Sequence, residues 1–149
     1  MSSYRFFILL AVFFLTVGIV DSQEVTTMTV QGRTVYVRRD MPAGLPGITG
    51  DYIASGGNRD SARSLLTIQA DGRGSIFIDK HAFSDFELNL KAPKQFSWGL
   101  LCLQNGELDK NTQGHFGLVL KGDDGSEAVW NVMIHRGKAL LNGGTWQPK

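Results

Sequence analysis

Residues 115–135, HFGLVLKGDDGSEAVWNVMIH, contain two runs of alternating apolar and polar side chains separated by a short acidic turn. The apolar side chains that recur at every second position are Phe116, Leu118 and Leu120 in the first run and Trp130, Val132 and Ile134 in the second. A period of two is typical of strands with one buried and one solvated face. The stretch therefore predicts an antiparallel hairpin.

The register of this hairpin depends on its loop. A three-residue loop at 124–126 would oppose Leu118 to Val132 and keep all six apolar side chains on one face, whereas a two-residue loop would oppose Leu118 to Asn131. A slip of one residue moves every side chain of a strand to the other face. Six buried apolar side chains, at about 1.5–3 kcal/mol each, outweigh a turn preference, so we expect the three-residue loop.

Two histidines lie opposite each other in that register. His115 faces His135 on the polar face, where directly opposed Cβ atoms are about 4.5–5.5 Å apart and two imidazoles could share a metal ion. Zinc sites, however, use three or four protein ligands. We therefore interpret the pair as surface histidines and expect neither a metal site nor a cofactor.

The same alternation recurs along the chain at intervals of about ten residues. The expected strands are 25–30, 34–39, 51–55, 64–70, 74–79, 85–90, 96–103, 115–121, 128–135 and 139–146. Gly-, Asn- and Asp-rich turns separate them and leave no room for crossover helices. The sequence thus predicts an all-β antiparallel meander of about eight to ten strands. Closure into an up-and-down barrel removes exposed edges, and we favour it over a β-sandwich.

The N-terminus has the layout of a secretory signal. Arg5 precedes the uncharged run Phe6–Val20, and small residues lie three before and one before a cleavage site after Ser22. The apolar run is shorter than the roughly 20 residues that a membrane-spanning helix needs. We expect a signal peptide at 1–22, no membrane span after processing, and a secreted or periplasmic protein.

Two further segments follow the expected signal peptide. Residues 23–48 contain a hairpin turning at Gln31-Gly32, and then a linker with two prolines and two glycines within 41–47. Residues 49–149 form the expected barrel domain. The hairpin is either an arm or an edge of that barrel.

Charge and motifs exclude several functions. The chain has 15 Lys and Arg against 14 Asp and Glu, a net charge of +1, which gives no reason to expect a nucleic acid as partner. We interpret Arg33, Tyr36, Arg38 and Arg39 as an exposed, charge-protected edge strand. The sequence lacks Gly-x-Ser-x-Gly and His-Glu-x-x-His motifs, and its single cysteine, Cys102, lies in an apolar run. We expect no enzyme.

Gly50-Asp51-Tyr52 and the turn pattern of residues 66–74, LTIQADGRG, resemble the start of lipocalin-like (calycin-type) domains. Those domains often open with a glycine and an aromatic residue two positions later. The chain departs from the pattern in having Tyr52 where Trp is usual, a hairpin ahead of the opening strand, and a single cysteine. The resemblance implies a barrel that holds a small apolar ligand.

The apolar residues define two hypotheses of function. The first is an exported, non-catalytic binding protein whose small apolar ligand lies inside the barrel, and the expected ligand-binding residues are Trp98, Leu100, Leu118 and Trp130. The alternative is a protein-interaction module, such as an inhibitor or an envelope assembly factor, whose partner is another exported protein. It would use an edge strand or the outer face that carries Val129 and Met133, because apolar residues beyond those needed for a core indicate a covered face or a contact surface.

Overall fold

The computed structural model describes residues 24–54, 65–77 and 94–149. The expected signal peptide and the expected strand 85–90 lie outside these ranges. Within them, no helix has the length and apolar character needed to cross a membrane.

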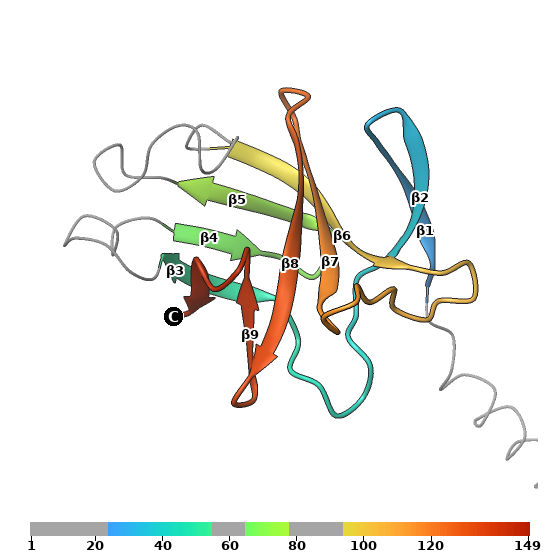
Figure 1. The fold of residues 1–149 in the computed structure, drawn as a ribbon. Coiled ribbons are helices and arrows are strands. Elements are labelled where there is room, and N and C mark those ends of the chain that lie inside the picture. Colours follow the sequence, from blue (N-terminus) through green and yellow to red (C-terminus); the bar gives the residue numbers. More distant parts are fainter. Residues whose placement is uncertain (1–23, 55–64, 78–93) are drawn as a thin grey trace, which may run out of the picture.

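Ten β-strands make up the described part of the chain (Figure 1). They are β1 (Thr26–Val30), β2 (Arg33–Arg38), β3 (Gly50–Ala54), β4 (Leu65–Ile68), β5 (Arg73–Phe77), β6 (Lys94–Cys102), β7 (Phe116–Gly122), β8 (Glu127–His135), β9 (Lys138–Leu141) and β10 (Trp146–Pro148).

Strands β3 to β10 form a closed eight-stranded barrel. Each strand pairs antiparallel with the next, and β10 returns to pair with β3, where Trp146 lies opposite Ala54. Closure leaves these strands without a free edge. The predicted up-and-down meander and its closure into a barrel are confirmed, as is the barrel architecture that the lipocalin-like resemblance implied.

The β7–β8 register differs from the expected one by two residues. Leu118 lies opposite Trp130 rather than Val132, and the three-residue loop is 123–125 rather than 124–126. Such loops place their last residue in the left-handed region, which glycine adopts at no steric cost. Gly125, with φ of 86°, takes that position, whereas the expected loop would have placed Ser126 there. A shift of two preserves the buried face, so the predicted faces are right and the predicted partners are wrong.

The last expected strand, 139–146, is two strands. Asn142, Gly143 and Gly144 all have positive φ, at 54°, 65° and 90°. Three successive left-handed residues cannot continue an extended chain, so the backbone turns between β9 and β10. This turn allows β10 to reach β3 and close the barrel.

The N-terminal hairpin β1–β2 turns at Gln31-Gly32, as predicted, with φ of 50° and 73°. β2 pairs with the C-terminal half of β6, where Val37 lies opposite Leu101, while the N-terminal half of β6 pairs with β5. The hairpin therefore branches from the barrel wall (Figure 1).

The hairpin covers part of the outer face of β6 and β7. Val30 and Val37 bury Val119 in a small second core, against which Leu101 packs. At the hairpin tip the Gln31 N–H donates to Glu127 Oε2 at 2.7 Å, and Lys121 Nζ donates to the Thr29 carbonyl at 3.1 Å. The hairpin thus covers the outer face at Val119, whereas Val129, expected on an apolar outer face, is exposed.

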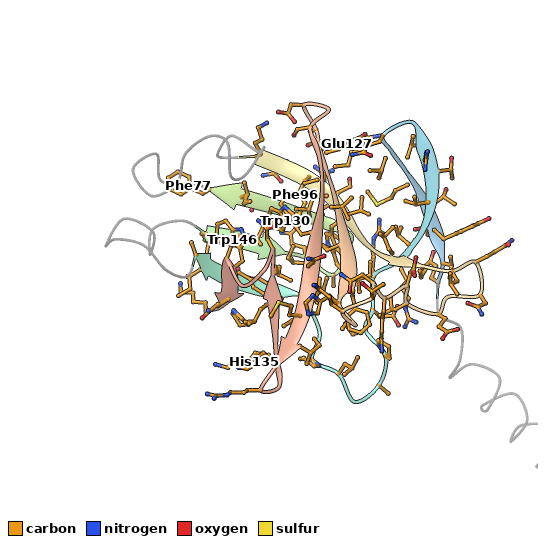
Figure 2. The ribbon with its side chains drawn as sticks, in the orientation of Figure 1. Phe77, Phe96, Glu127, Trp130, His135 and Trp146 are labelled. Carbon is orange, nitrogen blue, oxygen red and sulfur yellow. The ribbon has the colours of Figure 1, made fainter. Side chains whose placement is uncertain are left out.

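The main core fills the barrel with inward-facing side chains from every barrel strand. Its members include Tyr52, Leu66, Ile76, Phe96, Trp98, Leu118, Trp130, Leu141 and Trp146. Figure 2 shows Phe96, Trp130 and Trp146 among the strands of the barrel.

Candidate functional site

The four expected ligand-binding residues meet inside the barrel. Leu100, Leu118 and Trp130 lie side by side on β6, β7 and β8, because Leu118 is opposite both of the others. Trp98 is opposite Leu120, and its indole N–H donates to the Gln69 carbonyl at 2.8 Å. All four belong to the main core, with exposed fractions of 6% or less. Their role in ligand binding stays a prediction.

A hollow of about 720 Å³ lies beside the linker that joins β2 to β3, and we call it the linker hollow. It lies between the start of β1, the linker that joins β2 to β3, and the β4–β5 turn. It is lined by Glu24, Thr26, Arg39, Asp40, Met41, Pro42, Ala43, Leu45, Gly47, Ile48, Thr49, Ala70 and Asp71. None of the four interior residues lines it.

Arg39 provides a positioned positive charge in the linker hollow. Its guanidinium packs against Gly72 so closely that a Cβ on this glycine would overlap the guanidinium carbon. Gly72 has a φ of 86°, which a side chain would also disfavour. Within the described ranges, no carboxylate lies within salt-bridge distance of Arg39.

Two of the carboxylates in the linker hollow are already engaged. Asp40 accepts hydrogen bonds from Arg38, with Nη2 to Oδ2 at 3.0 Å, and Asp71 Oδ1 accepts the Arg73 N–H at 2.9 Å. Glu24 lies at the start of the described chain. Among the described residues, the hollow therefore combines a guanidinium that has no carboxylate partner with apolar walls.

Arg38 corrects the expectation of an exposed basic strand. Its side chain is only 3% exposed, and besides its bonds to Asp40 its Nη1 donates to the Gly106 carbonyl at 2.8 Å. It joins the end of β2 to the loop between β6 and β7. Arg33, Tyr36 and Arg39 are exposed, as predicted.

A second hollow, of about 450 Å³, lies near the β8–β9 turn, and we call it the histidine hollow. It is lined by Leu45, Lys110, Gln113, Gly114, His115, Phe116, Met133, Ile134 and His135. Leu45 separates the two hollows, since it lines both. Figure 2 shows His135 at the lower end of β8.

The two histidines are not directly opposed, because of the two-residue shift in register. Phe116 pairs with Val132, so a continuation of this register would bring His115 opposite Met133 rather than His135. Both imidazoles nevertheless line the same hollow. In the described part of the chain, no three His, Cys, Asp or Glu side chains lie close enough to hold a metal ion together.

The sequence reasoning missed the linker hollow. It treated residues 41–47 only as a boundary and assigned Arg39 to an edge strand. Two signals could have drawn attention to this segment: the apolar residues Met41, Leu45 and Ile48 in and beside a Pro/Gly-rich stretch, and an arginine two residues before it.

Cys102, the one cysteine of the chain, is buried inside the barrel. Burial raises the pKa of this thiol, and the opposing effect of Arg38 is smaller. A protonated, shielded thiol is a poor nucleophile. Its environment is that of a core residue.

No protein-family model matches the chain, and no curated protein or solved structure is significantly similar to it. The resemblance to lipocalin-like domains is therefore one of barrel architecture.

Proposed function

We propose that this chain is an exported, non-catalytic binding protein whose ligand is a small amphipathic carboxylate held in the linker hollow. The observation that carries the proposal is the guanidinium of Arg39, packed against Gly72 without a carboxylate partner among the described residues. A guanidinium binds a carboxylate through two parallel hydrogen bonds.

The walls of the linker hollow suit the apolar part of such a ligand. Met41, Leu45 and Ile48 come from the linker, and Ala70 comes from the β4–β5 turn. Ligand sites commonly combine apolar walls with a few polar groups that fix orientation. Because Gly72 already restricts the guanidinium, little side-chain freedom is lost on binding.

The interior of the barrel is the competing location. Trp98, Leu100, Leu118 and Trp130 pack in one continuous core, and in small barrels such residues fill the interior. The linker hollow, in contrast, has a volume typical of sites that bind small ligands.

Calorimetric titration with medium-chain fatty acids, and with the corresponding alcohols as uncharged controls, tests the proposal. We expect the acids to bind and the alcohols to bind about tenfold or more weakly, because a charged hydrogen bond contributes about 1.5–3 kcal/mol. Arg39→Gln should cause the same loss, whereas Arg33→Gln, at an exposed arginine beside the hairpin turn, should not.

Binding of the acids that is unchanged in Arg39→Gln would place the ligand elsewhere, with the barrel interior as the first alternative. Absence of binding by every acid in the series would overturn the proposed ligand class.

A second candidate function is binding of another exported protein by strand addition to β1. Among the described strands only β2 pairs with β1, and the five residues of β1 include no charge and no proline. Edges of this kind accept a further strand. Lys121 already occupies the Thr29 carbonyl on this edge, which leaves little of it free. Light scattering and a pull-down from exported proteins, compared with a Thr27→Pro variant, would detect such a partner.

A further inference from the structure

We propose that His115, Met133 and His135 form a binding site for Cu(I) in the histidine hollow. All three side chains line this hollow. Arg39 is not among the residues that line it, so the proposed Cu(I) site is separate from the proposed carboxylate site and does not depend on it.

The register of β7 and β8 brings the three residues together. The last pair of these strands is Phe116 with Val132; His115 directly precedes Phe116, and Met133 directly follows Val132. His135 is two residues further along β8 and shares the face of Met133. Directly opposed Cβ atoms lie about 4.5–5.5 Å apart and diagonal neighbours about 7–8 Å apart. A bound ion can span these Cβ separations, because the donor atoms of imidazole and thioether side chains lie further along the side chain than Cβ.

His115 has an unused donor atom. Its Nδ1 is shielded from solvent and has no hydrogen-bond partner in the described part of the protein. A buried polar atom without a partner costs about 1–3 kcal/mol, and a metal ion bound to its lone pair would remove this cost. The backbone here is fixed, since His115 N–H donates to Asn111 Oδ1 at 3.0 Å and Asn111 N–H donates to the His115 carbonyl at 2.9 Å.

The charges around the hollow select the ion. Among the described residues that line it there is no carboxylate, while Lys110 is one of them, with its Nζ 5.2 Å from the centre of the Phe116 ring. Mg²⁺ and Ca²⁺ need oxygen ligands, and a divalent ion would add two positive charges beside this lysine. Neutral imidazoles with a soft thioether suit the monovalent ion Cu(I).

The surroundings permit entry and then limit contact with water. His135 is exposed and Met133 is half-buried, so an ion can reach the donors from solvent. Leu45, Phe116 and Ile134 provide apolar walls around them. A weakly hydrated ion with a low charge tolerates such walls better than a divalent ion does.

Anaerobic competition against a chromogenic Cu(I) chelator tests the site with the ion alone. We expect the purified chain to take up one Cu(I). Met133→Leu and His135→Asn should each weaken its affinity about tenfold or more, because each removes a proposed ligand and loss of a group that merely orients a ligand already costs about tenfold. Met41→Leu is the matched control, because Met41 lines the linker hollow and is not among the residues of the histidine hollow.

Two measurements separate this site from other sources of binding. Cys102→Ala should retain Cu(I), because the thiol is buried within the barrel core. X-ray absorption of the complex should show a sulfur ligand that is lost in Met133→Leu. Failure to take Cu(I) from the chelator, or equal affinity in all these variants, would overturn the proposal, as would loss of binding in Cys102→Ala.

Discussion

Val37 lies directly over Gly99 on the outer face of the barrel: a Cβ placed on Gly99 would be 2.6 Å from the Cβ of Val37. Gly99 is opposite Val119, the barrel residue that the hairpin buries. Because Gly99 has no side chain, β2 can pack closely against β6 at this position. The attachment of the hairpin depends on this close approach.

Gly99→Ala should destabilise the protein by about 1–3 kcal/mol, the usual cost of inserting a methyl group into a packed region. Urea unfolding would measure this loss. Gly47→Ala is the matched control, because an added Cβ there meets no atom within 4 Å and Gly47 lacks a left-handed φ. Equal stability of the two variants would contradict the proposed packing of the hairpin.

Arg38 and Asp40 should differ strongly in their contribution to stability, although they form one ion pair. Arg38→Met should cost about 1–3 kcal/mol, because it leaves the buried Gly106 carbonyl without its 2.8 Å hydrogen bond. Asp40→Asn should cost less than about 1 kcal/mol, because its side chain is 60% exposed and water replaces the lost contact. Chemical denaturation of both variants compares the two costs, and equal costs would show that the ion pair dominates.

The faces of the strands could be predicted from the sequence because burial imposes a period of two on each strand. Alternation at Phe116, Leu118 and Leu120 is sufficient to identify the inward side. The pairing partners required a further fact, the positive φ that only Gly125 adopts comfortably in the β7–β8 loop. Turn chemistry, which burial was expected to outweigh, decides between registers that leave the same face buried.

The site residues were harder to predict, because both hollows join segments that are distant in sequence. Arg39 acquires its fixed position from Gly72, more than thirty residues away, and Arg38 is buried by the loop that contains Gly106. Alternation within one strand contains no information about such contacts. The four interior residues were placed together correctly, because each lies on the buried face of its own strand.

Acidification should weaken the contact between the β5 and β7–β8 segments. Arg73 donates to both oxygens of Asp123, at 3.0 and 2.7 Å, and these hydrogen bonds lower the pKa of that carboxyl. A lowered pKa in the folded state gives a contribution that is present above the unfolded pKa, about 3.9, and is lost as the pH falls through the folded value. NMR titration should show Asp123 protonating below the ordinary range. Arg73→Gln should return it toward that range, and an unchanged titration would contradict the role of this pair.

Ionisation of Tyr52 should lower the stability of the fold at high pH, the opposite of the pH dependence expected from Asp123. Its hydroxyl donates to the Ile48 carbonyl at 2.7 Å, which holds the end of the linker against the barrel, and burial raises the pKa of Tyr52 to about 12. The neutral phenol is favoured in the folded state, so its contribution is complete below the unfolded pKa, about 10, and is lost as the pH rises toward 12. Ultraviolet absorbance of phenolate should show a late-titrating tyrosine that is absent in Tyr52→Phe and retained in Tyr36→Phe, a change at an exposed ring. Tyr52→Phe should also cost about 0.5–1.5 kcal/mol at neutral pH through the lost hydrogen bond.

The same variant should weaken binding of the fatty acids, because Tyr52 holds Ile48, which lines the linker hollow. A folded protein whose tyrosines all ionise near 10 would show that this phenol is not held as the structure indicates.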